Sequence, residues 1–215
     1  MNKAKPLPRY LVQRFQGWKE TEYKDNQAWY RKLADGQHPR AMVISCCDSR
    51  VHVTSIFGAD QGEFFIHRNI ANLVPPYKPS GDFHGTSAAV EYAVKALKVA
   101  HILVMGHSGC GGVQGCIDMC SNDKSPLHDD FPFVAKWLQI LKPRYKSVAD
   151  ITDVDARQRA FEHQAVLTSL QNLMSFPAIS ERVNKEELSL HGLWHDIGEG
   201  EIQVYNSEID RFEAL

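Results

Sequence analysis

Two short stretches of the sequence combine thiols, an imidazole and a charged pair. The first, CCDSR, begins at Cys46 and directly follows the apolar run 41–45. The second, HSGCGG, begins at His107, contains Cys110 and follows the apolar run 101–106. Two thiolates and one imidazole are ligands that Zn²⁺ prefers, and three protein ligands leave a fourth position open for water or substrate. This residue set therefore indicates a catalytic zinc site and not a closed structural one.

The segments around these two stretches predict the fold that positions them. Strand patterns lie at 41–45, 63–67 and 101–106, helical patterns lie at 85–99, 131–143 and 152–174, and the chain closes on two strand-like runs joined by GEG. Such alternation predicts an α/β fold with a mostly parallel central β-sheet, an antiparallel edge strand and flanking helices. Because ligands collect outside the carboxyl ends of the strands of such a sheet, we expect both stretches at one edge.

The first 40 residues differ from the rest because their helical pattern precedes the first strand. Apolar and aromatic residues repeat at helical spacing over 10–34, and GQHP at 36–39 breaks the pattern. We expect 1–40 to form an N-terminal helical arm that packs on a partner subunit, and 41–215 to form the α/β domain. Helices that cover one face of their own sheet would give the same pattern.

The composition excludes several classes of protein. The 215 residues are 43% hydrophobic, which suffices for a core, and the net charge of −2 gives no sign of a nucleic-acid or polybasic membrane surface. The N-terminus lacks the apolar core of a signal peptide, and no apolar run has the length of a membrane span. Five cysteines in a chain of this length favour a reducing compartment. We expect a cytoplasmic protein that binds neither nucleic acid nor membrane.

A phosphate-binding loop is the main alternative for HSGCGG, since a strand, a glycine-rich turn and a helix also form a phosphate cradle. However, the stretch lacks the Gly-Lys-Ser/Thr ending of a P-loop and does not fit GxGxxG. A thiol phosphatase loop would need an arginine six residues after its cysteine. The residue six after Cys46 is His52, and the residue six after Cys110 is Cys116.

In this order, CCDSR and HSGCGG resemble the paired signatures of the beta-class carbonic anhydrases, Cys-x-Asp-Ser-Arg and His-x-x-Cys. The likeness is to the plant-like, type I subtype, and the stretches 67–77, 88–99 and 190–202 also look like family segments. The resemblance implies an enzyme that reversibly hydrates carbon dioxide to bicarbonate and a proton. It further implies one Zn²⁺ per subunit, attack by zinc-bound hydroxide, and a homodimer or higher homo-oligomer.

The family pattern also implies a role for each residue of the two signatures. It assigns Cys46, His107 and Cys110 as zinc ligands and leaves Cys47 at a variable position, where we expect it to pack. Two thiolates cancel the charge of Zn²⁺, so the bound water is acidified less than in a site of three neutral histidines. Asp48 would then orient that water, and Arg50 would keep the carboxylate ionised and off the metal through a bidentate pair.

The resemblance extends to a substrate pocket. Gln37, nine residues before Cys46, would donate to a substrate oxygen from the partner subunit, and the backbone N–H of Gly111 would donate to another. Phe65, Ile70 and Tyr92 match residues that line the small apolar pocket for CO2. Plain core packing is the alternative for these three side chains.

One departure from a family pattern is informative. A subtype regulated by non-catalytic bicarbonate uses a Trp, an Arg and a Tyr at positions that correspond here to Val43, Arg68 and His195. Two of the three residue types are missing, so we expect no such allosteric site.

The other histidines and cysteines considered for function each have two interpretations. His52, His67 and His84 are candidate proton shuttles only because histidine titrates near neutrality, and ordinary surface or structural roles explain them better. Cys116 and Cys120 lie four apart, so they share a helix face and suit either a second metal site or small semi-buried thiols.

Three other functions compete with CO2 hydration. Hydrolysis of CS2 or COS could use the same ligands with altered access to the site. A thiol-redox or structural zinc protein would need neither Asp48 nor Arg50 nor Gln37, so these residues argue against it. A scaffold homologue without catalysis would not need to keep all three ligands.

Overall fold

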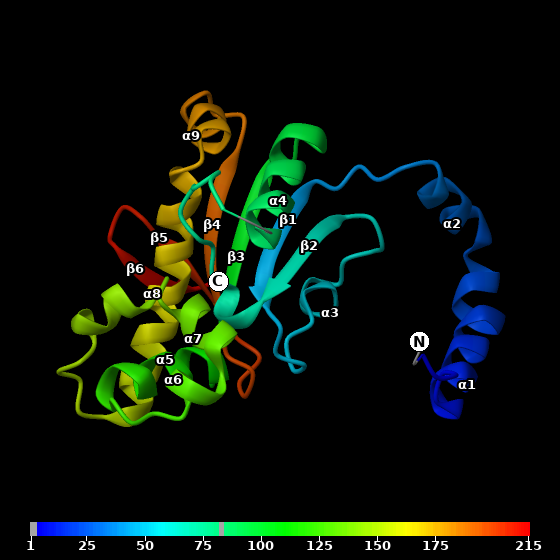
Figure 1. Cartoon of the computed structure of the whole chain (residues 1–215). Helices are drawn as coiled ribbons and strands as arrows, with labels where there is room; N and C mark the ends of the chain where they lie inside the picture. The colour runs from blue at the N-terminus through cyan, green and yellow to red at the C-terminus, as the bar shows by residue number, and fades with distance from the viewer. Residues whose placement is uncertain (1–3, 82–83) are drawn as a thin grey trace. The chain divides into compact units, whose positions relative to one another are not determined.

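The computed structural model describes residues 4–81 and 84–215 (Figure 1). The chain divides into two compact units, residues 1–38 and 39–215. Each unit has its own internal contacts.

The first unit is helical and its helices have no buried residue among those described. Its elements are α1 (Arg9–Trp18), the π-helical turn η1 (Lys19–Tyr23) and α2 (Gln27–Ala34). Trp18 contacts the rings of Tyr23 and Tyr30, each at a centroid distance of 5.5 Å. This aromatic cluster joins the helices to one another, while Tyr10, Phe15 and other large apolar side chains stay exposed.

The second unit is built on a six-stranded sheet in the order β2-β1-β3-β4-β5-β6. The strands are β1 (Ala41–Cys46), β2 (Phe64–Asn69), β3 (His101–His107), β4 (Ser189–His195), β5 (Ile202–Asn206) and β6 (Arg211–Ala214). The first four strands in this order pair in parallel, and the last two pairings are antiparallel. The predicted fold class is therefore confirmed. Strand β6 was not predicted, so the antiparallel edge has two strands and not one.

Helices cover the two faces of this sheet unequally. They are α3 (Val53–Phe57), α4 (Gly85–Glu91), α5 (Gly111–Ser121), α6 (Leu127–Asp130), α7 (Pro132–Leu138), α8 (Val154–Met174) and α9 (Pro177–Asn184), with short turns η2 (Ile70–Asn72), η3 (Tyr92–Ala96) and η4 (Lys142–Ser147). One core contains Ile44 and Val104 with residues of α4, α8 and α9. Because side chains alternate along a strand, Val43 and Met105 point to the other face, where they pack with α3.

The sheet register brings the two signature stretches together. Ser45 of β1 lies opposite Met105 of β3, so the ends of these neighbouring parallel strands reach the same edge. Helix α8 packs closely behind β3 at Gly106, where an added Cβ would lie 2.9 Å from a methyl carbon of Val166. The glycine therefore lets the helix approach the strand that carries the second stretch.

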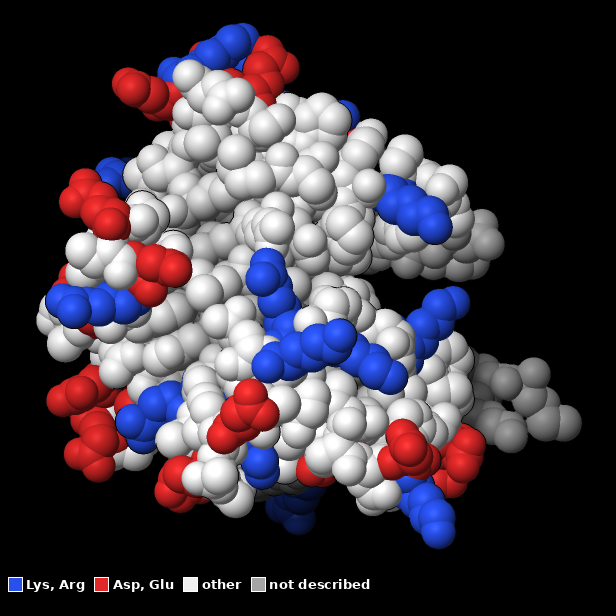
Figure 2. Space-filling model, turned by 90° about the vertical axis from the view of Figure 1, so that its left-hand side faces the viewer, with Lys and Arg blue, Asp and Glu red and all other residues white. Residues whose placement is uncertain are grey.

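Within residues 4–81 and 84–215, no helix combines the length and the apolar character that crossing a bilayer requires. On the face drawn in Figure 2, acidic and basic side chains are both present, and a few basic side chains lie next to one another near its centre.

Candidate metal centre

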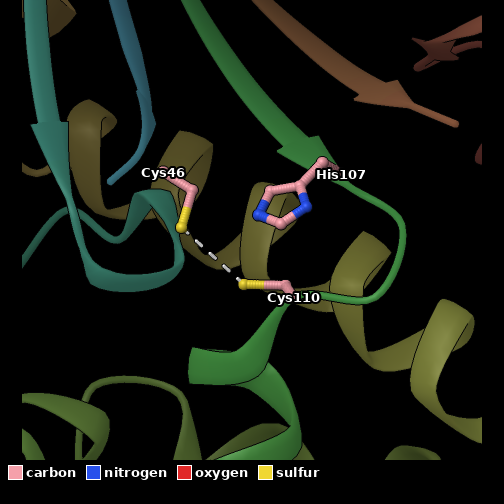
Figure 3. A group of neighbouring side chains, drawn as sticks. All are labelled: Cys46, His107 and Cys110. Carbon is pink, nitrogen blue, oxygen red and sulfur yellow. Dashed lines mark hydrogen bonds between the residues drawn. The ribbon is translucent and has the colours of Figure 1, made fainter. Parts of the chain in front are cut away.

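Cys46, His107 and Cys110 meet at the carboxyl edge of the sheet (Figure 3). Their ligand atoms all lie within 4.8 Å of one another, and all three residues are buried. The two sulfur atoms are 3.9 Å apart. In the part of the chain that the structure describes, no other group of three or more His, Cys, Asp or Glu has this arrangement.

The local backbone places each of these three side chains. Cys46 is the last residue of β1, and His107 is the last residue of β3. The turn after β3 passes through Gly109 at φ +65, a left-handed conformation that favours glycine, and Cys110 then begins α5 as its N-cap. Two strand ends and one helix start therefore converge on one point.

The donor set fits a zinc ion. His107 donates from Nδ1 to the carbonyl oxygen of Ser108 at 3.0 Å, which leaves Nε2 as the atom with the free lone pair. This Nε2 is buried and has no hydrogen-bond partner among the described residues. A buried unpaired polar atom costs about 1–3 kcal/mol, so its position beside two thiols is best explained by a cation that it would bind.

The electrostatics of the two sulfurs favour a shared cation. A hydrogen bond with the Cys110 thiol, together with smaller contributions from His107 and the backbone N–H groups of Asp48 and Ala71, lowers the pKa of Cys46 to about 4 in spite of its burial. The Cys46 sulfur and burial raise the pKa of Cys110, although the N–H groups of Val113 and Gly112 act against this. The pair therefore gives up one proton readily and holds the other until a cation replaces it.

Asp48 and Arg50 form a two-pronged ion pair beside these ligands. Arg50 donates from Nε to Oδ1 at 2.9 Å and from Nη2 to Oδ2 at 2.7 Å, and Nη2 also donates to the carbonyl of Gly109 at 3.0 Å. The hydrogen bonds from Arg50 hold the pKa of Asp48 well below its usual range. Oδ2 of this ionised carboxylate lies 3.9 Å from Nε2 of His107.

Two further residues hold the ligands through the backbone. Arg68 donates to the carbonyls of Cys46 and Asp48, at 2.8 and 2.6 Å. Glu162 of α8 accepts the backbone N–H of Cys110 at 2.9 Å, and its other oxygen accepts the indole N–H of Trp194 at 2.9 Å. Neither role was predicted from the sequence. An acid on the apolar stripe of α8 was the available signal for Glu162.

Of the residues predicted to line a CO2 pocket, Ile70 directly follows β2 at this edge, whereas Phe65 lies opposite Met42 near the other end of the strands, and their role stays a prediction. The rings of Phe65 and Tyr92 are 5.8 Å apart and tilted by 34°. Ile70 packs against the first turn of α5, because a Cβ on Gly112 would lie 2.6 Å from its Cγ2. At Gly111 an added Cβ would meet nothing within 4 Å, so space is open beside its backbone. Gln37 belongs to the first compact unit, and its role stays a prediction.

The other titratable candidates have local structural contacts. The ring Nδ1 of His52 hydrogen-bonds Thr54 at the start of α3. His67 is bonded to Thr86, and His84 contacts the carbonyl of Ser80. These contacts suit structural roles for the three histidines.

Among the described residues, Cys47, Cys116 and Cys120 belong to no group of three or more possible metal ligands. Burial raises the pKa of Cys116 to about 12, and Cys120 is half-buried. Both observations favour small packed thiols over a second metal site. Cys47 is exposed, so the expectation that it packs is wrong. The reason is that β1 ends at Cys46, and the chain beyond it turns outward.

Comparisons with known proteins agree with this geometry. A family model described as carbonic anhydrase matches residues 41–202. The chain is 34% identical over 208 residues to a carbonic anhydrase of Synechocystis sp., covering 95% of this chain and 73% of the relative. It is 40% identical over 189 residues to beta carbonic anhydrase 5, chloroplastic, of Arabidopsis thaliana, covering 86% of this chain and 60% of the relative.

Solved structures of beta-carbonic anhydrases have a similar fold. The beta-carbonic anhydrase CcaA superposes with a TM-score of 0.88 at 32% identity, covering 96% of this chain and 91% of that chain. One of two tetrameric beta-carbonic anhydrases from Sordaria macrospora superposes with a TM-score of 0.77 at 35% identity, covering 91% of this chain and 94% of that chain.

Proposed function

The chain belongs to the beta-class carbonic anhydrase family, and we propose that it hydrates CO2 reversibly at a zinc ion held by Cys46, His107 and Cys110. The observation that carries this proposal is the unpartnered, buried Nε2 of His107 beside two thiols and an ionised carboxylate. The products are bicarbonate and a proton.

Zinc, when bound, supplies Lewis acidity that turns water into a nucleophile at neutral pH. Two thiolates offset the charge of the ion, so this acidification is weaker than with three neutral imidazoles. The residues of the chain must therefore contribute more to orienting the attacking water.

Asp48 is the group that we assign to this orientation. It is ionised and its Oδ2 lies 3.9 Å from the free nitrogen of His107, close to where the reacting water must sit. As a carboxylate it can only accept hydrogen bonds, so it would hold the water with a lone pair directed at the carbon of CO2. Arg50 contacts both carboxylate oxygens and thereby keeps Asp48 from swinging onto the metal.

A small uncharged substrate such as CO2 would need an apolar pocket. We propose that Phe65, Ile70 and Tyr92 form the walls of this pocket and that the backbone N–H of Gly111 donates to a substrate oxygen. Gly111 is the first residue of α5, where N–H groups are free of intrahelical partners. Gln37 would donate to the substrate from a partner subunit.

An oligomer is part of this proposal. The arm, residues 1–40, would pack on a partner subunit, because its helices bury none of their described residues and expose Tyr10 and Phe15. A homodimer is the smallest assembly with this arrangement. The five cysteines are unpaired, which suits a reducing compartment, and we place the protein in the cytoplasm.

Stopped-flow measurement of CO2 hydration with a pH indicator tests the proposal. Zinc-replete protein should raise the rate far above that of buffer. The variant Cys46→Ala should contain no zinc and should give the buffer rate. A zinc-replete wild-type protein that gave only the buffer rate would refute the proposed reaction.

A further inference from the structure

The side chain of Arg68 spans from the edge strand β2 to the turn that follows β1. Its Nε donates to the carbonyl of Cys46 at 2.8 Å, and its Nη2 donates to the carbonyl of Asp48 at 2.6 Å. The backbone N–H of Cys47, between these two residues, donates to the carbonyl of Asn69 at 2.9 Å. The end of β2 therefore holds the turn at three consecutive residues.

The partners of Arg68 are unusual for a cation. Within the described residues, no carboxylate lies within the 4.0 Å of an ion pair with its guanidinium, and both printed partners are neutral carbonyls. A guanidinium is planar and rigid, so its two donors fix the separation of the two acceptors. A lysine carries the same charge but donates from a single point and cannot fix that separation.

We infer that Arg68 is a positioning residue that sets where the Asp48 carboxylate stands relative to the Cys46 sulfur. This inference rests on the proposed function, in which the sulfur holds zinc and the carboxylate orients water. Arg50 controls the same residue from its other end, since it binds the carboxylate while Arg68 binds the main-chain carbonyl. Two arginines thus fix Asp48 at the side chain and at the backbone.

Loss of the two hydrogen bonds from Arg68 to the main-chain carbonyls, which we call the Arg68 clamp, should affect both zinc retention and the reaction rate. Without these two hydrogen bonds the turn after β1 can move. The Cys46 sulfur is then held less firmly, and the Asp48 carboxylate loses its alignment. A misplacement of about 1 Å can cost roughly 10²-fold in rate. Because the substrate pocket does not involve Arg68, the effect should fall on kcat and leave KM nearly unchanged.

A second arginine provides a matched control. Arg182 of α9 also donates to two main-chain carbonyls, those of Val94 and Glu187, at 3.1 and 3.0 Å. None of its recorded partners belongs to the candidate metal centre. Arg182→Lys therefore reproduces the loss of a two-carbonyl clamp without touching the ligand turn.

The experiment compares Arg68→Lys and Arg68→Ala with Arg182→Lys in the full-length zinc protein. Three quantities are measured: Tm, the rate of zinc release to a chromophoric chelator, and kcat and KM for CO2. The absorption spectrum of the Co²⁺-substituted proteins reports the geometry of the ligands. We expect both Arg68 variants to release zinc about tenfold or more faster, to change the Co²⁺ spectrum, and to lose kcat by roughly 10- to 100-fold. Arg182→Lys should lower Tm only.

Two results would overturn the inference. One is wild-type zinc release and an unchanged Co²⁺ spectrum in both Arg68 variants, whatever happens to kcat. The other is an equal acceleration of zinc release in Arg182→Lys, which would mean general destabilisation. Failure of the proposed function would look different, because the wild-type protein would then give no CO2 hydration while zinc release still separated the Arg68 variants from the control.

Discussion

The two loops that carry the ligands are held in opposite ways. After β1, the turn with Cys46 is held by two cations, Arg50 and Arg68, and the Arg50 side chain is 52% exposed. After β3, the backbone N–H of Cys110 is held by an anion, Glu162, which is 2% exposed and lies among the helices behind the sheet, although Arg50 also reaches the carbonyl of Gly109 in this turn. The turn after β1, with Asp48 and Arg50, therefore faces solvent, and we call it the exposed half of the site. The turn after β3, with Cys110 and its partner Glu162, belongs to the core, and we call it the buried half.

This difference separates two tasks. The buried carboxylate of Glu162 accepts from two buried donors, the N–H groups of Cys110 and Trp194, so its loss would leave both unpaired. The Asp48–Arg50 pair is open to water, where an ion pair adds little to stability. We expect changes in the buried half to affect folding and metal retention, and changes in the exposed half to affect the reaction.

The largest effect should come from removing a ligand in the buried half. Cys110→Ala leaves only Cys46 and His107, which are too few protein ligands for a stable zinc site. The variant should contain no zinc by elemental analysis and should hydrate CO2 at the buffer rate. Zinc at one ion per chain in this variant would show that Cys110 is not a ligand.

Next in size should be the loss of the negative charge in the exposed half. Asp48→Asn keeps the shape of the side chain and all three ligands, so zinc content should match the wild type. Because an amide is a poorer acceptor than a carboxylate, kcat should fall roughly 10²-fold, with Tm unchanged. Wild-type kcat in Asp48→Asn would contradict the role proposed for this residue.

The pH dependence of stability and of kcat tests whether Asp48 stays ionised. Arg50 holds the pKa of Asp48 below its usual range, so the stability that this shift gives is complete above the unfolded value of about 3.9. That stability is lost only as pH falls through the lower folded value. Between pH 5 and 9, the pH profile of kcat should contain no ionisation that Asp48→Asn removes; the disappearance of one would mean that Asp48 titrates in this range.

A smaller effect on activity, with a larger one on stability, should follow from changing Glu162. Glu162→Ala leaves two buried donors unpaired, at about 1–3 kcal/mol each. Urea unfolding should therefore show a clear loss of stability, and zinc release should be faster. Glu162→Gln keeps an acceptor for one donor and should lie between wild type and alanine. Equal stability of all three proteins would contradict the proposed role of the buried half.

The smallest effect should come from adding one methyl group beside the pocket. Gly112→Ala would place a Cβ 2.6 Å from Ile70 Cγ2 and 3.3 Å from the backbone nitrogen of Ala71, so the pocket wall must shift. We expect kcat/KM to fall about tenfold, with overpacking of about 1–3 kcal/mol. Gly85→Ala is the matched control, since its Cβ meets nothing within 4 Å and the residue has no proposed role in the site. Equal kcat/KM in the two variants would show that the wall is not there.

The sequence predicted the sheet and its edge because strand patterns end directly at the chemically active residues. Cys46 and His107 each follow an apolar run, and parallel strands then require that they meet. Arg68 and Glu162 could not be assigned in this way, because they bind main-chain atoms of residues far along the chain. No pattern of side-chain types records such contacts.

Other differences have equally local causes. Cys47 is exposed because the strand ends one residue earlier, which alternation alone does not reveal. Strand β6 has four residues, so it depends on pairing with β5 more than on its own pattern. The helix predicted over 131–143 ends at Leu138 and continues as the separate turn η4, which contains Pro143.

The most direct test of the zinc centre is a metal titration of the chelator-treated protein, followed by stopped-flow CO2 hydration. We predict that activity disappears on chelation and returns linearly with added Zn²⁺ until one ion per chain is bound. Full activity in metal-free protein, or activity that does not return at any amount of zinc, would contradict the assignment of Cys46, His107 and Cys110 as the site of the reaction.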